Sequence, residues 1–423
     1  MKMNAAVLHA YHDMRVEQVE APAYAEDEVL IRVRACGLCG TDLHIVDGAF
    51  AGRWPRAFPF IIGHEWAGEI VAVGSQVKGF KVGDRVVGEN HLPCRTCRMC
   101  KEGRYNLCEA AGKPGSGHRH FGHVDQGALA EYAARPASLL YAIPEHVSFE
   151  EASIINQAAI ALHGCRRARI QPGDAVAVLG PGLMGLLSMQ MAFVMGASRV
   201  IVTGTSRTKR LQLAKELGAS ETIDVLKEDP IARIRELTGG RGVDAVLECA
   251  GTPEALRTGL EVVRRGGTIA LTGLMGKQEV SIGTDRMVLD EIDVVGVRSG
   301  PNCFQPVIDM VASGRLNARP LVDHVFPLDE VVLALEDFRD RKSGAVREII
   351  QIWARRRGSR RVSRAAARGG TNDEERASDR SGGGHRAGGR GGRGRVGAAA
   401  GTQAGGPAEL LREHLRDHLR GGG

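Results

Sequence analysis

Residues 175–194 read AVAVLGPGLMGLLSMQMAFV, and this stretch decides the fold class of the chain. The apolar run at 175–180 has the length of a buried strand, and 183–197 is apolar and long enough for a buried helix. Gly180, Gly182 and Gly185 form a GxGxxG pattern between them. In this strand–turn–helix context the pattern is typical of a dinucleotide-binding turn, in which the helix N-terminus faces the pyrophosphate.

The same strand–helix alternation continues on the C-terminal side of this turn. Further strands are predicted at 199–204, 243–251, 268–273 and 293–297, with helices at 208–219 and 252–267. Repeated strand–helix units predict an α/β fold with a parallel sheet that is covered by helices on both faces.

The segment 199–210, RVIVTGTSRTKR, bears on the choice of dinucleotide. An Asp or Glu about twenty residues beyond the glycine turn normally binds the ribose hydroxyls of NAD, and this segment has none. Arg207 and Arg210 follow instead and are suited to the 2′-phosphate of NADP. Because hydroxyl and backbone groups can also hold NAD, both NAD and NADP remain candidates.

The N-terminal part of the chain has a different pattern. Residues 1–150 predict short strands and turns, for example at 28–35, 69–74 and 84–90, and no long helix. After residue 298, a helix is expected at 304–315 and a closing strand at 348–353. We therefore expect a β-rich first region and an α/β second region.

Composition and charge narrow the functional classes. The chain has 423 residues, 43% hydrophobic and 25% charged, which is ordinary for a globular protein of two domains. It has neither an apolar run of membrane-span length nor a leading secretory segment, so we expect a cytoplasmic protein without a membrane partner. Residues 354–423 hold 16 arginines and 18 glycines. We predict a disordered tail there, either a solvated extension or an RGG-like arm; without aromatic residues to stack on bases, we do not expect a nucleic-acid partner.

Four of the nine cysteines fall within one short segment. They are Cys94, Cys97, Cys100 and Cys108. Four thiolates at this spacing predict a tetrahedral zinc site with no open coordination position, which makes the site structural. The alternative, four free thiols in a loop, does not account for the regular spacing.

A second group of chemically active residues lies nearer the N-terminus. The segment 36–44 reads CGLCGTDLH, and 63–68 reads GHEWAG. Cys39 and His64 provide a soft and a borderline ligand, a pair that suits zinc, and Glu65 adds an oxygen ligand or an outer partner. Alone, a cysteine and a histidine 25 residues apart are equally well explained as buried structural residues.

Taken together, these motifs resemble those of the zinc-dependent medium-chain alcohol dehydrogenases over about residues 3–352. CGLCGTDLH, GHEWAGEIVAVG, the four-cysteine segment, GALAEY (127–132) and VLGPGLMG carry the resemblance. The threonine 3-dehydrogenase and sorbitol (polyol) dehydrogenase branch is the most similar. The resemblance implies a GroES-like catalytic domain, 1–150 and 298–353, interrupted by a Rossmann domain, 151–297, and a homo-oligomer, either dimer or tetramer.

The resemblance also implies roles for individual residues. Cys39 and His64 would hold a catalytic zinc beside Glu65, and Thr41 and His44 would relay the proton. His91 would lie near the substrate. The residues implied to line the cofactor site are Met184, Arg210, Gly273, Leu274, Val297 and Arg298.

The expected third zinc ligand departs from the family pattern. The family usually has Cys, Glu or Asp just before the helix that leads into the Rossmann domain, and counting back from His163 places Asn156 there. A neutral amide is a weak zinc ligand. Three outcomes remain open: Asn156 binds weakly, Glu65 takes its place, or the site has lost zinc. The alternative to any role in metal binding is that Asn156 only caps the helix.

The expected activity is the reversible oxidation of a secondary alcohol to a ketone, with two zinc ions and NAD or NADP. The substrate is a polyol, a threonine-like amino alcohol or a simple secondary alcohol. The competing interpretation is a nucleotide-binding relative without catalytic zinc, either a zinc-free reductase or a sensor.

Overall fold

The computed structural model describes residues 1–353, except 114, 206, 208, 277 and 341–342. The described residues all belong to one compact unit, Met1–Arg360. The predicted disordered tail lies outside the described residues. In the described part of the chain, no helix has both the length and the apolar character that a membrane crossing requires.

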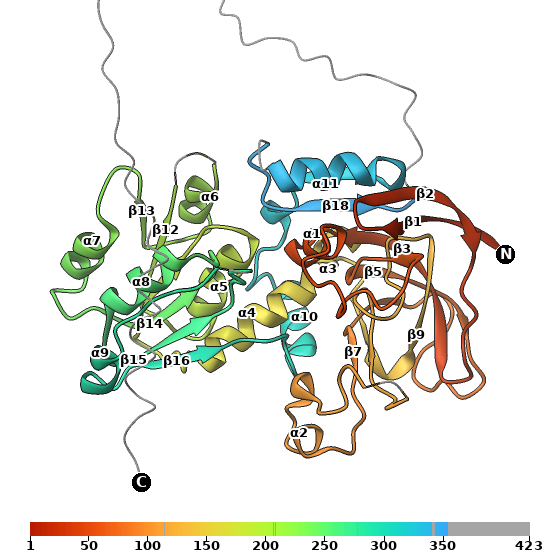
Figure 1. Ribbon diagram of the computed structural model, residues 1–423, viewed down its shortest axis with the longest axis horizontal. Coiled ribbons are helices and arrows are strands. Elements are labelled where there is room, and N and C mark those ends of the chain that lie inside the picture. The colour runs from red at the N-terminus through yellow and green to blue at the C-terminus, as the bar shows by residue number, and fades with distance from the viewer. Residues whose placement is uncertain (114, 206, 208, 277, 341–342, 354–423) are drawn as a thin grey trace, which may run out of the picture. The chain divides into compact units, whose positions relative to one another are not determined.

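The glycine turn connects one strand of a six-stranded parallel sheet to a helix that packs against this sheet (Figure 1). The strand order is β13-β12-β11-β14-β15-β16, which is the doubly wound order in which the first strand lies at the centre. The strands are β11 (Ala175–Leu179), β12 (Arg199–Gly204), β13 (Glu221–Asp224), β14 (Val243–Glu248), β15 (Val263–Leu271) and β16 (Asp293–Gly296).

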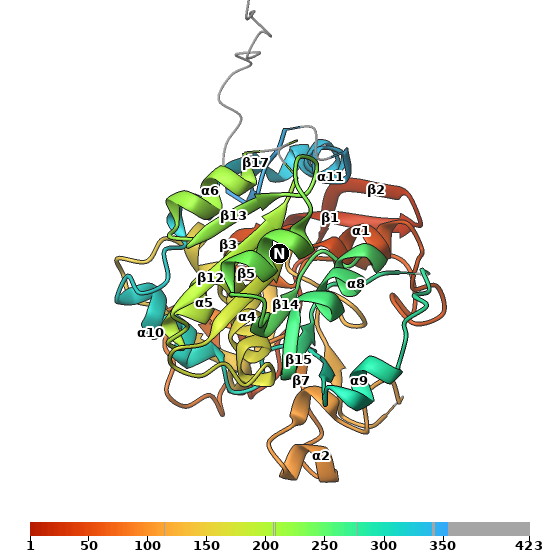
Figure 2. The ribbon, with the colours of Figure 1, turned by 90° about the vertical axis from the view of Figure 1, so that its left-hand side faces the viewer.

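Helices cover both faces of this sheet because the side chains of each strand alternate between two apolar clusters. Val176 and Val178 of β11 lie in one cluster with residues of α4 and α5, and Ala177 and Leu179 lie in another with residues of α7 and α8. The helices of this region are α4 (Ile155–Arg167), α5 (Leu183–Val194), α6 (Arg210–Glu216), α7 (Pro230–Leu237), α8 (Pro253–Val262), α9 (Asp285–Leu289) and α10 (Phe304–Ala312). The predicted α/β class is confirmed. Figure 2 shows the same region after a turn of 90° about the vertical axis.

The N-terminal half is built on a second, mainly antiparallel sheet of order β10-β6-β5-β3-β18-β17, with β9 also paired to β3. Its strands are β3 (Glu28–Gly37), β5 (Glu65–Val73), β6 (Arg85–Gly88), β9 (Tyr132–Pro136), β10 (Leu140–Ala142), β17 (His324–Pro327) and β18 (Glu348–Gln351). Because β18 pairs with β3, the C-terminal strand closes onto the N-terminal sheet. The exact division into domains stays a prediction.

Smaller elements complete this half. They are β1 (Lys2–Ala10), β2 (Asp13–Glu20) and β4 (Phe60–Ile61) in one sheet, β7 (His91–Leu92) and β8 (Arg119–His120) in another, and the helices α1 (Gly40–Val46), α2 (Arg98–Lys101), α3 (Phe149–Ala152) and α11 (Val331–Asp340). Short 3₁₀ turns lie at Tyr105–Leu107, Ala137–Leu139, Arg319–Leu321 and Leu328–Glu330.

The main difference from the predicted elements lies at the junction of α8 and β15. The helix expected at 252–267 ends at Val262, and the strand begins at Val263, five residues before the predicted start. Two consecutive β-branched residues favour extended backbone there. The strand continues through Gly267, where an added Cβ would meet the Asp244 carbonyl oxygen at 3.0 Å.

Candidate functional site

Among the described residues, two groups of thiol, imidazole and carboxylate side chains are close enough to share a metal ion. The first is the four-cysteine cluster: Cys94, Cys97, Cys100 and Cys108. The second is the mixed cluster: Cys39, His64 and Glu65. In each group the ligand atoms lie within 4.8 Å of one another.

The four-cysteine cluster has the dimensions of a tetrahedral zinc site. The Cys94 and Cys100 sulfurs are 4.0 Å apart, as are those of Cys97 and Cys108. Zinc–sulfur bonds of about 2.3 Å in a tetrahedron require sulfur separations of about 3.8 Å. The Thr96 hydroxyl and the Cys97 backbone N–H donate to the Cys94 sulfur and lower the pKa of that thiol to about 6, whereas burial raises the pKa of the Cys100 and Cys108 thiols. The residues therefore fit zinc.

The mixed cluster lies where strand β3 ends and the adjacent antiparallel strand β5 begins. Cys39 follows β3 and precedes α1, His64 directly precedes β5, and Glu65 is the first residue of β5. The pairing of β3 with β5 places Gly37 opposite Glu65, which brings the two segments together. His64 and Glu65 are buried, at 5% and 1% exposure, and Cys39 is half-buried.

A buried carboxylate that the sequence analysis did not single out orients this cluster. Asp42 accepts a hydrogen bond from the Cys39 backbone N–H at 2.8 Å, and its other oxygen lies 3.3 Å from His64 Nδ1. This leaves His64 Nε2 facing Glu65, 3.5 Å from its nearer oxygen. Burial alone would lower the pKa of His64, but Asp42 and Cys39 together raise it well above its usual value. A carboxylate behind a histidine is the usual outer support of a zinc ligand, so the mixed cluster also fits zinc.

Arg347, which is 282 positions from Glu65, holds Glu65 in place. Its guanidinium forms a buried ion pair with the Glu65 carboxylate and donates a hydrogen bond of 2.6 Å to the Leu38 carbonyl. The guanidinium occupies the space beside Gly37, where an added Cβ would overlap the Arg347 nitrogen at 1.7 Å. Gly37 is therefore required for this ion pair.

The start of α4 contributes two amides, and they have different partners. Asn156 donates to the His64 carbonyl oxygen at 3.2 Å. The Gln157 amide donates to the Cys39 sulfur at 3.3 Å and also to the Glu65 carboxylate. Counting back from His163 indicated Asn156, but neighbouring helix residues point about 100° apart, so a shift of one residue changes the face. The sequence analysis missed Gln157 for this reason.

Thr41 and His44 lie one turn apart on α1. The Thr41 hydroxyl is 3.7 Å from the Cys39 sulfur. The His44 ring is half-buried and lies 5.6 Å from the Phe50 ring. These two residues therefore extend from the mixed cluster toward an aromatic side chain at its margin.

Four imidazoles form a continuous row that we call the imidazole column: His91, His120 and His123 are stacked, and the His64 ring lies against His123 at a tilt of 49°. The ring centroids are 3.9 Å apart for His91–His120, 3.8 Å for His120–His123 and 4.4 Å for His123–His64. His91 Nε2 lies 3.2 Å from the Ser299 hydroxyl. The column thus connects the mixed cluster to the loop that follows β16.

The expected cofactor residues lie beyond the carboxyl ends of neighbouring parallel strands, where doubly wound sheets bind ligands. They are Gly180, Gly182, Met184 and Gly185 after β11, Gly273 and Leu274 after β15, and Val297 and Arg298 after β16. Gly180 has φ +103°, and a Cβ on Gly185 would lie 1.8 Å from the Gly180 carbonyl oxygen. A Cβ on Gly182 would meet nothing within 4 Å, so the turn is open to a ligand at that point.

The two predicted 2′-phosphate ligands differ in their surroundings. Arg207 is exposed after β12. Arg210 is half-buried at the start of α6 and donates to the Ala345 carbonyl.

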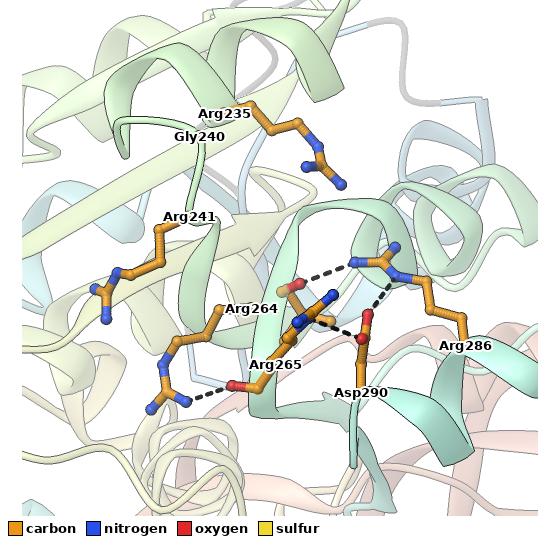
Figure 3. Close-up of a pocket in the computed structure, with 8 residues that line it drawn as sticks. Arg235, Gly240, Arg241, Arg264, Arg265, Arg286 and Asp290 are labelled. Atoms are coloured by element: carbon orange, nitrogen blue, oxygen red, sulfur yellow. Dashed lines mark hydrogen bonds and ion pairs between the residues drawn. The ribbon is translucent and has the colours of Figure 1, made fainter.

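A hollow of about 540 Å³ lies elsewhere, at the amino-terminal ends of β14 and β15 (Figure 3). Its lining includes Arg235, Arg241, Arg264, Arg265 and Arg286. These guanidiniums have partners: Arg241 and Arg264 bind Asp244, Arg265 binds Asp290, and Arg235 and Arg286 bind carbonyls at the end of α8. The arginines of this hollow hold the fold together and leave no cation unpaired.

Two family models match the chain. An alcohol dehydrogenase GroES-like domain matches residues 25–145, and a zinc-binding dehydrogenase domain matches residues 184–313. Their order and positions agree with the β-rich and α/β halves described above.

Individual relatives agree with these matches. The chain is 38% identical over 334 residues to a sorbitol dehydrogenase of Bacillus subtilis, which covers 79% of this chain and 93% of the relative. Two solved structures are each 30% identical and cover 83% of this chain. A zinc-binding dehydrogenase of Sinorhizobium meliloti bound to NADP is matched over 100% of its length, with a TM-score of 0.75. The 2R,3R-butanediol dehydrogenase of Bacillus subtilis is matched over 99%, with a TM-score of 0.74.

Proposed function

This chain belongs to the zinc-dependent medium-chain alcohol dehydrogenases, in the sorbitol dehydrogenase branch, and is an NAD(P)-dependent enzyme that oxidises small alcohols. On this premise we propose that it oxidises a secondary hydroxyl of a polyol to the ketone at the mixed cluster. The observation that carries the proposal is the convergence of Cys39, His64 and Glu65 within 4.8 Å, supported from behind by Asp42.

We propose that Cys39, His64 and Glu65 hold the catalytic zinc. Glu65 offers a charged oxygen within 4.8 Å of the Cys39 and His64 ligand atoms, whereas Asn156 offers a neutral amide oxygen, which supports Glu65 over Asn156 as the third ligand. A zinc ion bound there supplies Lewis-acid polarisation that lowers the pKa of the alcohol. The four-cysteine cluster would hold the structural zinc, as its sulfur separations of 4.0 Å support.

Protein groups near the cluster are placed to move the proton and to receive the cofactor. The Thr41 hydroxyl, 3.7 Å from the Cys39 sulfur, accepts the substrate proton and passes it toward His44, one turn further on α1. The glycine turn and the segments after β15 and β16 would hold the dinucleotide, which would supply its nicotinamide ring as the hydride acceptor. Arg207 is exposed after β12, where it is available to the 2′-phosphate of NADP, which supports NADP as a candidate beside NAD.

Two further proposals concern assembly and location. The side chains of Val288 and Leu289 on α9 are 74% and 81% exposed, which supports a homo-oligomer, to be tested by light scattering during size-exclusion chromatography. The four-cysteine cluster requires reduced thiols and supports a cytoplasmic location.

The experiment that tests the proposed activity is a screen of sorbitol, xylitol and 2,3-butanediol with NAD and with NADP, followed by absorbance at 340 nm. We expect turnover of at least one alcohol, with two zinc ions per chain by elemental analysis. A protein that carries only one zinc and oxidises none of these alcohols would contradict the proposal and favour a nucleotide-binding relative without catalytic zinc.

A further inference from the structure

The segment that follows β16 leaves the parallel sheet at the expected cofactor residues. The Val297 backbone N–H still donates to the Leu271 carbonyl oxygen at 2.9 Å, which continues the strand pairing by one residue. Ser299 and Asn302 then have φ +54° and +58°. Left-handed backbone is uncommon for residues other than glycine and persists where surrounding contacts hold it. The conformation of residues 298–302 therefore depends on their neighbours.

Several of these neighbours belong to the four-cysteine loop, residues 94–108. The Asn106 side-chain amide donates to the Arg298 carbonyl oxygen at 2.7 Å. The Asn302 backbone N–H donates to the Tyr105 hydroxyl at 2.8 Å, and its side-chain amide donates to another carbonyl oxygen of the loop at 3.2 Å. The loop thus holds both ends of a segment that lies 192 to 197 positions further along the chain.

The two side chains that make these contacts are themselves fixed. Asn106 is 6% exposed, and Tyr105 is half-buried. The Tyr105 hydroxyl accepts from the Asn302 N–H and donates to the Glu89 carboxylate at 2.8 Å, so it is used both as acceptor and as donor. The same Glu89 oxygen accepts from the Tyr141 hydroxyl at 2.7 Å. In the described part of the chain, only the first of these two hydroxyls also bonds to the segment after β16.

The loop and the segment are closely packed. A hollow of about 20 Å³ lies between them, and its lining includes Tyr105 and Asn106 of the loop and residues 299–301 of the segment. This volume has room for about one water molecule. The segment also lies against α4, because an added Cβ on Gly300 would meet the Ala159 backbone at 2.4 Å. The segment therefore has little freedom to move while the loop is in place.

We propose that Asn106 and Tyr105 are positioning residues for the dinucleotide, which hold the backbone after β16 in the conformation that binds NAD(P). This rests on the proposed function, in which the segment after β16 holds the dinucleotide. If the segment is released, only a fraction of the protein has the binding conformation at any time, and the apparent affinity falls by that fraction. A bound dinucleotide selects the ordered segment, so the chemical step should change little. The four-cysteine loop then contributes to cofactor affinity as well as to stability.

The test is a fluorescence titration of the holoenzyme with NADH and with NADPH, together with kcat and the KM for the oxidised dinucleotide on an alcohol that the parent oxidises. Asn106→Ala should raise the Kd and this KM about 3- to 10-fold, the effect of one lost hydrogen bond, and should change kcat less than about 2-fold. The zinc content should stay that of the parent. A lower kcat or a lower stability with an unchanged KM would make Asn106 merely structural and would overturn the proposal.

Two tyrosine variants form a matched pair, because Tyr105→Phe and Tyr141→Phe each remove one hydroxyl from Glu89 and keep the ring. Tyr105→Phe also takes the acceptor from the Asn302 N–H, so it should raise the Kd about 3-fold or more, whereas Tyr141→Phe should keep about the parent value. An equal loss in both variants would assign the effect to Glu89 and contradict the proposal. A Kd within about 2-fold of the parent in both Asn106→Ala and Tyr105→Phe would contradict it as well.

The titration separates this inference from the proposed activity. If the parent binds NADH or NADPH but oxidises none of the alcohols, the proposed activity fails, and the order of the Kd values still decides the inference. If the parent oxidises an alcohol and every variant shares its Kd and KM, the proposed function stands and the inference is wrong. A parent protein that binds neither dinucleotide would overturn both.

Discussion

The four-cysteine cluster and the mixed cluster bring together similar ligand atoms from very different lengths of chain. In the first, Cys94 and Cys108 are 14 positions apart and their contacts stay within one loop. In the second, Glu65 is held by Gln157, 92 positions away, and by Arg347, 282 positions away. A site built from one loop depends on the spacing of its ligand residues along the sequence. A site built from four segments depends on how the whole fold packs those segments together.

The two clusters also differ in whether a bound metal could reach a substrate. The four-cysteine cluster presents sulfur on all sides, so a metal there has no room for a substrate. The mixed cluster has three ligand groups and is supported by buried carboxylate and guanidinium groups, the arrangement that leaves one side available. The predictions below test this contrast, from the largest expected effect on turnover to the smallest.

Removal of the Cys39 thiol should nearly abolish turnover. We expect Cys39→Ser to lower kcat by roughly 10³-fold, since several kcal/mol of transition-state stabilisation depend on the metal. Zinc content should fall from two to one per chain by elemental analysis, with the far-UV circular dichroism spectrum unchanged. Cys165→Ala, a buried cysteine outside both clusters, is the control and should retain both zinc ions. Unchanged turnover in Cys39→Ser would sink the assignment.

Replacement of Arg347 by methionine should weaken both stability and turnover. The change leaves the Glu65 carboxylate buried without its ion pair, which costs about 3–5 kcal/mol. Turnover should fall about 10- to 100-fold because an outer support of the cluster is lost. Denaturant unfolding and steady-state kinetics measure the two effects. Gly37→Ala, whose methyl would displace the same guanidinium, should reproduce the defect, and a normal Gly37→Ala enzyme would show that the ion pair is dispensable.

The neighbouring residues Asn156 and Gln157 offer a matched pair on one helix. Gln157→Ala removes the amide that contacts Cys39 and Glu65 and should lower kcat about 10-fold. Asn156→Ala removes only a hydrogen bond to the His64 carbonyl and should change kcat less than about 3-fold. The reverse order, with loss of zinc in Asn156→Ala, would make Asn156 the ligand.

The four-cysteine cluster should matter for stability more than for turnover. Cys97→Ser should leave one zinc per chain and raise the rate of proteolytic cleavage within 94–108, because the loop loses its cross-link. Turnover should fall only about 2- to 3-fold in the protein that remains folded, since the catalytic groups are elsewhere. If Cys97→Ser lowers turnover as far as Cys39→Ser, the two clusters do not have separate functions.

Glu348, next to Arg347 on β18, gives a pH-dependent prediction. The side chain is 1% exposed, and burial raises the pKa of its carboxyl to about 7. A carboxyl whose pKa is raised in the folded protein lowers the free energy of unfolding wherever the unfolded chain ionises more readily. This loss of stability begins as pH rises past the unfolded pKa, about 4.5, and is complete above the folded pKa, about 7. Glu348→Gln should therefore be more stable than the parent by about 3 kcal/mol at pH 8 but by less than about 1 kcal/mol at pH 5, with little change in turnover. Equal stability at both values would show that the carboxyl ionises freely in the folded protein.

The sequence alone determined the parts of this protein that are encoded locally. The glycine turn predicted a strand, a turn and a helix within 20 residues, and the structure places β11 and α5 there. The spacing of the four cysteines predicted their convergence, because residues three to eight positions apart in a loop meet without help from the rest of the fold. The choice between NAD and NADP and the domain boundaries stay predictions.

Only the tertiary structure decided the environment of the mixed cluster. No local pattern connects Arg347 to Gly37, since the contact arises when β18 pairs with β3. The choice between Asn156 and Gln157 depended on the rotation of α4 against β5, where a shift of one residue turns a side chain by about 100°. The imidazole column joins β7, β8 and the start of β5 in the same way. Spacing along the chain fixes contacts within a turn or a loop, but contacts between distant segments follow from the packing of buried surfaces that many residues share.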